Sequence, residues 1–272
     1  MKFNRSIISI IILIGLSGTF AQVSGQNVPL KKLQTISLQG IKNVTIDRLG
    51  NIYAQLENQT INKYDTEGNW MASFSNLERI EISNVEPWNP LSVFVFSSAA
   101  QEIELLDPSL VRQQRIAVDQ SLAIEPAMAC PGINNTYWLL DKSDLSLKKI
   151  DLKNSGVIVQ IDLNKITHPV QPNYVALREY QNMIFLVDQT TGVEMYSIVG
   201  KRIHKIEAAG LSYIGFLGQE LYYLQDGNLR FYDLYTEETH QLPVGNSKQA
   251  LATDERLILV NADSIEIFEY KP

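Results

Sequence analysis

The chain has 272 residues, 45% of them hydrophobic, and its 23 basic and 30 acidic side chains give a net charge of −7. An acidic surface repels phosphate backbones, so nucleic acid is not an expected partner. The single cysteine, Cys130, excludes an internal disulfide, and a single domain of this length is large enough to be held by its apolar core alone.

The beginning of the chain has the pattern of a secretory signal peptide. Lys2 and Arg5 precede an apolar run, Ile7–Phe20, that is shorter than a membrane span and is followed by small residues. An uncleaved anchor is the alternative, and no later stretch is long and apolar enough to cross a bilayer. We therefore expect residues 1–25 to be removed, leaving residues 26–272 as one exported domain in the periplasm or, alternatively, outside the cell.

One strand-turn-strand phrase then recurs six times. Its first residues are 42, 44, 46, 37 and 36 positions apart, and a period near forty built from short strands is typical of propeller blades. The copies span residues 52–65, 94–107, 138–151, 184–196, 221–233 and 257–268. Glycine-containing and Asx turns separate the strands, and each unit divides into four of them.

Side-chain size within the units indicates a radial arrangement. Small residues alternate in the segments expected nearest the axis, where strands crowd together: 127–130, 175–177, 213–216 and 250–253. The second strands are bulky, as expected where blades diverge and pack face to face: Phe94, Phe96, Trp138, Phe185, Tyr222 and Tyr223.

The end of the chain indicates how the ring closes. The sixth unit stops after three strands, whereas one unassigned strand, Lys31–Leu38, remains near the beginning. Placing this strand as the outer strand of the last blade hides a sheet edge and joins the two termini. The sequence therefore predicts an all-β, six-bladed β-propeller whose last blade is completed by an N-terminal strand.

The first unit, Val44–Gly68, resembles the NHL type of six-bladed propeller repeat. That family has an Asp-x-x-Gly-Asn-Ile/Val-Tyr strand followed by an Ile/Val-x-x-Phe/Tyr-Asp strand, and this unit matches both parts. Asp107, Asp151 and Asp233 keep the end of the phrase, whereas Gly50 and Asn51 have no counterpart in the other units. The resemblance implies the fold, and it implies a binding platform or, less often, an enzyme.

No catalytic set is visible. Enzymatic six-bladed propellers usually hold an axial metal with Glu, Asn, Asp or His from the inner strands, and these strands offer mainly Ala, Leu, Gly and Thr. The three histidines fall in three different units, and a zinc site needs three or four converging ligands. We therefore predict no catalytic residue, no metal ligand and no cofactor, and we retain a metal-dependent hydrolase or lactonase as the alternative.

The first candidate interface is the loop that contains Pro87, Trp88 and Pro90, in the turn between the first and second strands of the second unit. Tryptophan is a favoured interface anchor, and the prolines lower the entropy cost of presenting it. The alternative is that Trp88 folds back onto its own blade.

The second candidate interface is the loop Asn164–Pro172, which carries Ile166, His168 and Val170 between two units. Its apolar content exceeds what a linker needs, so we expect it either to cap the ring or to contact a partner. A solvated loop histidine is the alternative for His168.

These features favour a non-enzymatic binding or scaffold protein of the bacterial cell envelope. The isoleucine-rich signal and the single cysteine favour a bacterial source. The expected partner is a protein, in an outer-membrane or secretion assembly to which this chain would be an accessory subunit. Recognition of a sugar or peptide at the mouth of the channel is a further option.

Overall fold

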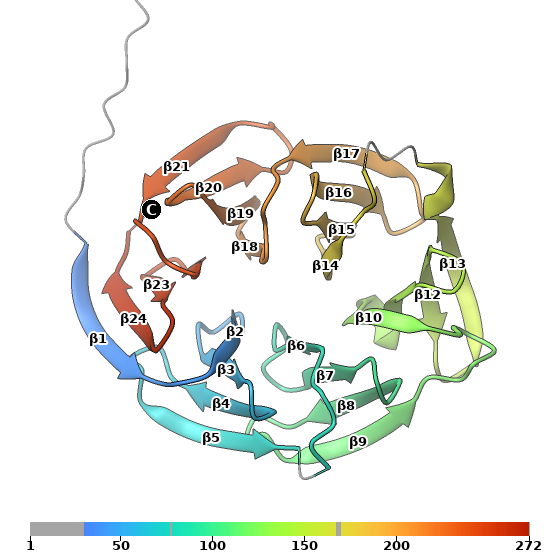
Figure 1. The fold of residues 1–272 in the computed structure, drawn as a ribbon, viewed down its shortest axis with the longest axis horizontal. Coiled ribbons are helices and arrows are strands. Elements are labelled where there is room, and N and C mark those ends of the chain that lie inside the picture. Colours follow the sequence, from blue (N-terminus) through green and yellow to red (C-terminus); the bar gives the residue numbers. More distant parts are fainter. Residues whose placement is uncertain (1–29, 77, 167–169, 272) are drawn as a thin grey trace, which may run out of the picture.

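The computed structural model describes residues 30–76, 78–166 and 170–271. In this part of the chain, six four-stranded antiparallel sheets stand side by side around a central axis, so the prediction of an all-β six-bladed propeller is confirmed (Figure 1). The same residues contain no helix with the length and apolarity needed to cross a membrane. The domain boundary predicted at residue 25 lies outside them.

In blades 1 to 5 the four strands run from the axis outward in chain order, and in blade 6 the outermost strand is β1. Blades 1 to 3 contain β2 (Ile41–Ile46), β3 (Ile52–Leu56), β4 (Thr60–Tyr64) and β5 (Trp70–Ser75); β6 (Asn84–Glu86), β7 (Val93–Ser97), β8 (Glu102–Leu106) and β9 (Arg112–Ala117); and β10 (Pro126–Pro131), β11 (Tyr137–Asp141), β12 (Ser146–Asp151) and β13 (Gly156–Asp162). Two single-turn 3-10 helices, η1 (Ile133–Asn135) and η2 (Leu163–Lys165), lie before β11 and after β13.

Blades 4 to 6 repeat this pattern. They contain β14 (Tyr174–Tyr180), β15 (Met183–Asp188), β16 (Gly192–Ser197) and β17 (Arg202–Glu207); β18 (Gly215–Leu217), β19 (Glu220–Gln225), β20 (Asn228–Asp233) and β21 (Thr239–Pro243); and β22 (Gln249–Ala252), β23 (Arg256–Val260), β24 (Ser264–Glu269) and β1 (Lys31–Ser37).

The ring closes as the sequence predicted. Strand β1 pairs antiparallel with β24, from Lys31 opposite Glu269 to Ser37 opposite Ser264, and so completes blade 6. Blades 6 and 1 are also joined near the axis, where the Gln249 side chain accepts a hydrogen bond from the Val44 N–H (3.2 Å) and donates one to the Val44 carbonyl (2.6 Å). These bonds satisfy backbone groups on β2 and fix the relative height of the first and last blades.

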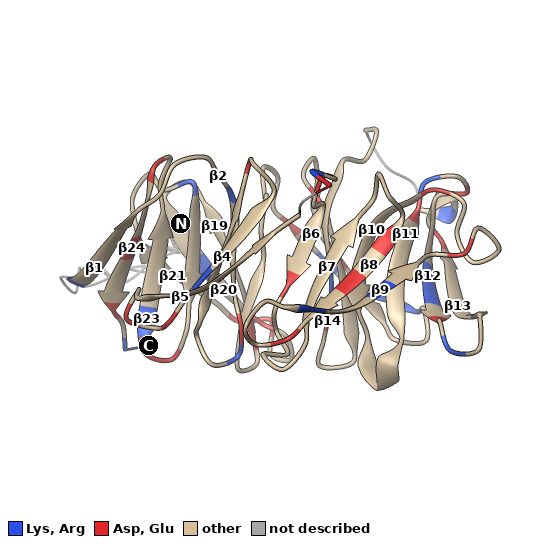
Figure 2. Ribbon diagram, turned by 90° about the horizontal axis from the view of Figure 1, so that it is seen from below, with Lys and Arg blue, Asp and Glu red and all other residues tan. Residues whose placement is uncertain are grey.

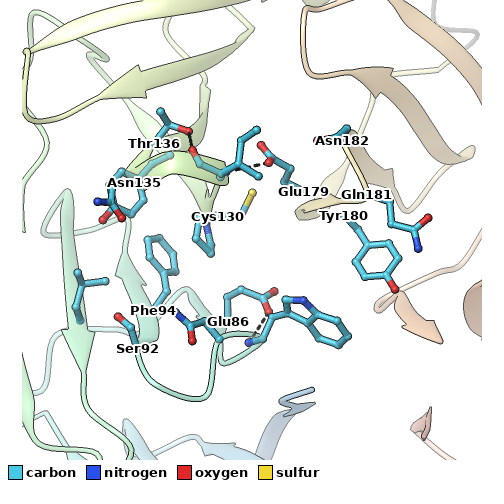
Figure 3. Close-up of a pocket in the computed structure, with 17 residues that line it drawn as sticks. Glu86, Ser92, Phe94, Cys130, Asn135, Thr136, Glu179, Tyr180, Gln181 and Asn182 are labelled. Carbon is cyan, nitrogen blue, oxygen red and sulfur yellow. Dashed lines mark hydrogen bonds between the residues drawn. The ribbon is translucent and has the colours of Figure 1, made fainter. Parts of the chain in front are cut away.

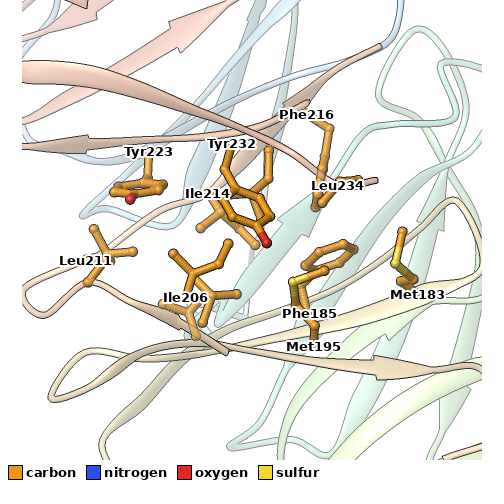
Figure 4. Close-up of a cluster of buried hydrophobic side chains, with 14 residues drawn as sticks. Met183, Phe185, Met195, Ile206, Leu211, Ile214, Phe216, Tyr223, Tyr232 and Leu234 are labelled. Atoms are coloured by element: carbon orange, nitrogen blue, oxygen red, sulfur yellow. The ribbon is translucent and has the colours of Figure 1, made fainter. Parts of the chain in front are cut away.

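The core lies between neighbouring blades. Figure 4 shows one such cluster, in which Phe185 of β15 and Phe216 of β18 meet with ring centroids 4.8 Å apart. The bulky second-strand residues are buried, each contributing about 1.5–3 kcal/mol. Near the axis space is scarce, because a Cβ at Gly215 would lie 2.2 Å from Cζ of Tyr222. The predicted gradient from small inner to large second strands is therefore present.

The repeated aspartates at the end of the phrase form turns. Asp65, Asp107, Asp151 and Asp233 each accept a hydrogen bond from the backbone N–H two residues further on, at 2.8–3.0 Å. This Asx turn leads the chain from the third strand of a blade to the fourth. The recurring aspartate is thus a structural residue in four blades.

The ring has two loop-bearing faces (Figure 2). Because strands within a blade are antiparallel, the loops between first and second strands and between third and fourth strands open on one face, which we call the Trp88 face. The remaining loops open on the opposite face. There, Asp141 and Asp188 are fully buried and accept backbone N–H groups from the segments that enter their blades, at Ile124, Glu125 and Asn173.

Candidate functional site

The Trp88 loop connects β6 to β7 on the Trp88 face. Pro87 and Pro90 are buried, whereas Trp88 is half-buried. The indole meets the ring of Tyr180 in blade 4 edge-on, with centroids 5.5 Å apart. The Trp88 N–H donates to Glu86 Oε1 at 3.1 Å, which ties the loop to the end of β6.

A pocket of about 520 Å³ opens beside Trp88, between blades 2, 3 and 4 (Figure 3). Its apolar lining comes from Trp88, Phe94, Leu105, Ile133, Tyr137 and Tyr180. Its polar lining includes Asn89, Ser92, Asn135, Gln181 and Asn182. A concave, mostly apolar site with a few polar groups is the usual form of a binding pocket, and this volume lies in the usual range.

Tyr180 is held firmly at one side of this pocket. Its ring stacks on Phe216 of blade 5 with centroids 4.2 Å apart, and its hydroxyl donates to the Gly218 carbonyl at 2.7 Å. Gln181 also donates to Gly218, at 2.8 Å, and accepts from the Tyr235 hydroxyl at 2.9 Å. This wall is therefore preorganised, which lowers the entropy cost of binding against it.

A buried ion pair closes the pocket toward the axis. Glu86 of blade 2 meets Arg178 of blade 4 through two contacts, Oε2 to Nε at 2.6 Å and Oε1 to Nη2 at 3.0 Å. Only 5% of the Glu86 side chain and 12% of the Arg178 side chain are exposed. Burial raises the pKa of Glu86, and the Arg178 guanidinium opposes that rise.

A second carboxylate at the pocket is also paired. Glu179 Oε2 accepts from Trp138 Nε1 at 2.6 Å and lies 3.5 Å from the Lys149 ammonium, while Oε1 accepts from the Ile133 N–H at 2.9 Å. The side chains of Glu179 and Lys149 are almost fully buried. Neither carboxylate therefore presents a free charge to a ligand.

A small cavity of about 80 Å³ lies in the channel, lined by inner-strand residues that include Asn43, Asn84 and Glu86. The hydrolase alternative predicted an axial cluster of such residues. Here Arg178 occupies both oxygens of Glu86, and Asn84 Nδ2 donates to the Ala129 carbonyl at 2.9 Å. Within the described ranges, no three His, Cys, Asp or Glu residues are grouped so that they could hold a metal ion.

Exposed large apolar side chains gather on the Trp88 face in the described part of the chain. Six lie in its loops: Leu49, Leu91, Val111, Ile133, Val199 and Tyr235. Six more lie within the first three residues of the outermost strands, next to that face: Leu33, Trp70, Met71, Val157, Ile158 and Ile203. The loops of the opposite face contribute Ile124 and Val170. The loops of the Trp88 face thus carry six of these side chains and those of the opposite face two, and this excess favours the Trp88 face as the interaction surface.

Charge is absent from the loops nearest the pocket. The loops between first and second strands of blades 2 to 5 contain no charged residue, and they span residues 87–92, 132–136, 181–182 and 218–219. The corresponding loops of blades 1 and 6 do contain charges, at Asp47, Arg48, Asp254 and Glu255. Depletion of charge at the centre of an apolar surface is typical of interface cores.

The second predicted interface loop lies elsewhere. It precedes β14, the innermost strand of blade 4, so it belongs to the opposite face and does not join Trp88. Ile166 is half-buried and packs against the core between blades 3 and 4, whereas Val170 is 52% exposed. His168 lies outside the described residues. The role of this loop in binding stays a prediction.

Three important residues of the site were not singled out from the sequence: Glu86, Arg178 and Tyr180. A signal existed for Arg178, because a charged residue directly after the inner-strand segment 175–177 must find a partner if it faces the axis. Tyr180 carried no such signal.

No protein-family model matches the chain, and no curated protein matches it. The NHL-type relationship therefore stays a prediction.

Solved structures do resemble it. Virginiamycin B lyase from Staphylococcus aureus has a TM-score of 0.59 at 10% identity and covers 88% of this chain and 99% of its own. The β-propeller domain of Cps50 (Swd1) from Myceliophteria thermophila has a TM-score of 0.60 at 10% identity and covers 89% of this chain and 100% of its own.

The extracellular domain of a protein from B. thetaiotaomicron, described as a one component system, has a TM-score of 0.54 at 13% identity. The match covers 85% of this chain, which spans about a third of that structure (33%). Identities this low show that the fold is shared and nothing more.

Proposed function

We propose that this chain is a non-enzymatic, protein-binding propeller of the bacterial cell envelope. In this proposal it acts in the periplasm, as an accessory subunit of an outer-membrane or secretion assembly, and its Trp88 face contacts the partner protein. The N-terminal pattern of Lys2, Arg5 and the apolar run supports export.

The observation that carries the proposal is the unequal distribution of exposed apolar side chains. Leu91 and Ile133 are exposed on the Trp88 face beside the pocket, and the folded core gains little from them there. Trp88, anchored by buried prolines and by the Tyr180 ring, lies at the same place. Rigid aromatic anchors surrounded by apolar side chains are what interface hot spots are made of.

A photo-crosslinking experiment tests the face directly. A photoreactive phenylalanine analogue replaces Leu91 on the Trp88 face (70% exposed) or Ile124 on the opposite face (63% exposed) in the organism that encodes the chain. We expect one protein to crosslink in high yield from position 91 and not from position 124. Crosslinking from position 124 alone, or from neither, would contradict the proposal.

Two further measurements on the same material separate the alternatives. Fractionation and N-terminal sequencing should find the chain in the periplasm, beginning near residue 26, and a cytoplasmic chain that still begins at Met1 would refute export. Metal analysis of the purified protein addresses the hydrolase alternative. A stoichiometric divalent metal that needs Glu86 would favour the enzyme, since that carboxylate lies at the axis.

A further inference from the structure

We propose that the pocket beside Trp88 receives one large aromatic side chain from an uncharged segment of the partner protein. This inference rests on the proposed function and adds the chemistry of the contact. It concerns the 520 Å³ space between blades 2, 3 and 4 rather than the Trp88 face as a whole.

The walls of the pocket are largely aromatic, which favours an aromatic ring as the occupant. On one side, Phe94 and Tyr137 stack with centroids 5.8 Å apart. On the other, Trp88 meets Tyr180 edge-on. An inserted ring would lie between two aromatic pairs, and each aromatic contact contributes about 0.5–1.5 kcal/mol beyond the area it buries. An aliphatic side chain would gain the burial without the ring contacts.

The pocket offers no free charge, which favours an uncharged segment as the ligand. The three loops that line the pocket (87–92, 132–136 and 181–182) have no charged residue, and both pocket carboxylates are occupied, Glu86 by Arg178 and Glu179 by Lys149. A charged group entering here would lose its hydration and find no free counter-ion. In contrast, Asn89, Asn135 and Asn182 can exchange hydrogen bonds with neutral peptide groups at the rim.

The surroundings of the pocket indicate that the side chain belongs to a polypeptide. Leu91, Ile133 and Tyr235 are exposed on the same face. Ile133 lines the pocket, and Tyr235 is bonded to the pocket residue Gln181. A free small molecule inside the pocket would leave Leu91 and Tyr235 in water, whereas a protein segment that crosses the face could cover them together with the pocket.

Titration with two peptides tests this inference. Both are capped, uncharged pentapeptides with glycine and serine flanks, and their central residue is phenylalanine in one and alanine in the other. The indole N–H resonances of the protein report the location: Trp70 lies at the outer edge, Trp88 lines the pocket, and the buried Trp138 donates its indole N–H to the pocket residue Glu179. We expect the phenylalanine peptide to shift the Trp88 resonance and to bind about tenfold more tightly than the alanine peptide.

Variants of matched chemistry complete the test. Ser92→Phe fills the pocket, and Ser247→Phe makes the same change at another half-buried loop serine, which lines a cavity on the opposite face. Ser92→Phe should weaken phenylalanine-peptide binding about tenfold, and Ser247→Phe should leave it unchanged. Equal binding of the two peptides, a shift of Trp70 alone, or unchanged binding by a folded Ser92→Phe protein would overturn the inference.

The same variants distinguish this inference from the proposed function. If the Ser92→Phe variant still crosslinks to the partner from position 91, the pocket inference fails, but the proposal that the Trp88 face binds a protein is supported. If position 91 captures no partner, the proposed function fails. A second copy of this chain is the other possible occupant of the pocket, and sedimentation of the protein alone tests for it. A dimer that the Ser92→Phe substitution dissociates would mean that the pocket binds a second copy, which would overturn the inference.

Discussion

The two faces of the ring use their loops for different purposes. On the opposite face, Asp141 and Asp188 are buried and bind the backbone of the segments that enter their blades, so those carboxylates stabilise the fold. On the Trp88 face, Leu91 and Ile133 are exposed, and their side chains make no comparable contribution. The difference teaches that these two buried carboxylates are needed by the fold, whereas the exposed apolar side chains of the Trp88 face are not.

The largest effect should come from breaking the ion pair beneath the pocket. Arg178→Met leaves the buried Glu86 carboxylate unpaired, which should cost about 3–5 kcal/mol of unfolding free energy. Because burial raises the pKa of Glu86, this loss should shrink as the pH falls toward the unfolded value near 4.3, where the carboxyl becomes neutral. Urea unfolding at pH 7 and pH 4.5 measures both quantities.

The matched control replaces both partners. Glu86→Leu with Arg178→Met removes the two charges together, so most of the stability should return. If Arg178→Met alone lowers the unfolding free energy by less than about 1 kcal/mol, the ion pair is not needed to hold the blades together at the axis.

Next in size is a carboxylate of the opposite face. Asp141 accepts from Lys148 Nζ at 2.7 Å, from the Ser143 hydroxyl at 2.7 Å and from backbone N–H groups, and Asp141→Ala should cost about 2–3 kcal/mol. Burial by itself would raise the Asp141 pKa, but the Lys148 ammonium and the hydrogen bonds outweigh it and lower that pKa. The contribution is therefore present above about pH 4 and lost as the pH falls through the lowered folded-state pKa.

Asp144 provides the control for this prediction. It also contacts Lys148, at 2.9 Å, but its side chain is 40% exposed, so Asp144→Ala should cost less than about 1 kcal/mol. Urea midpoints at pH 7, 5 and 3 for both variants give the comparison. Equal losses for the two variants would mean that burial of Asp141 adds nothing.

A smaller loss of stability is expected for Trp88→Ala. The substitution removes the edge-on contact with Tyr180 and part of a half-buried side chain, so we expect about 1 kcal/mol and a folded protein. Partner capture at position 91 should nevertheless be lost. Trp70→Ala, at the outer edge of the same face, is the control and should keep the partner. Equal capture by both variants would remove Trp88 from the interface.

The fold was predictable because its signals are local. Each aspartate that ends the phrase forms its Asx turn within two residues, so Asp107, Asp151 and Asp233 reveal where a third strand ends. The bulky second strands and the spare strand at Lys31 then follow from the need to pack blades and to hide an edge.

The candidate site was predictable only in part. The loop with Pro87, Trp88 and Pro90 is visible because its chemistry lies within four residues. Its contact with Tyr180 and the pairing of Glu86 with Arg178 depend on the curvature of a closed ring, which brings together residues 92 positions apart. In the loop before blade 4, Ile166 packs against the core between two blades. The sequence alone does not tell whether an apolar loop residue packs against the core or contacts a partner.

The smallest expected change in stability is also the sharpest test of the comparison between the faces. Leu91→Ser and Ile133→Ser remove exposed side chains, so each should alter the unfolding free energy by no more than about 0.5 kcal/mol. We propose that the apolar groups removed by these substitutions contact the partner, so partner binding should weaken although the fold is unchanged. Ile124→Ser makes the same kind of change on the opposite face and should affect neither property. If all three variants bind the partner equally well, the exposed apolar residues of the Trp88 face do not contribute to an interface.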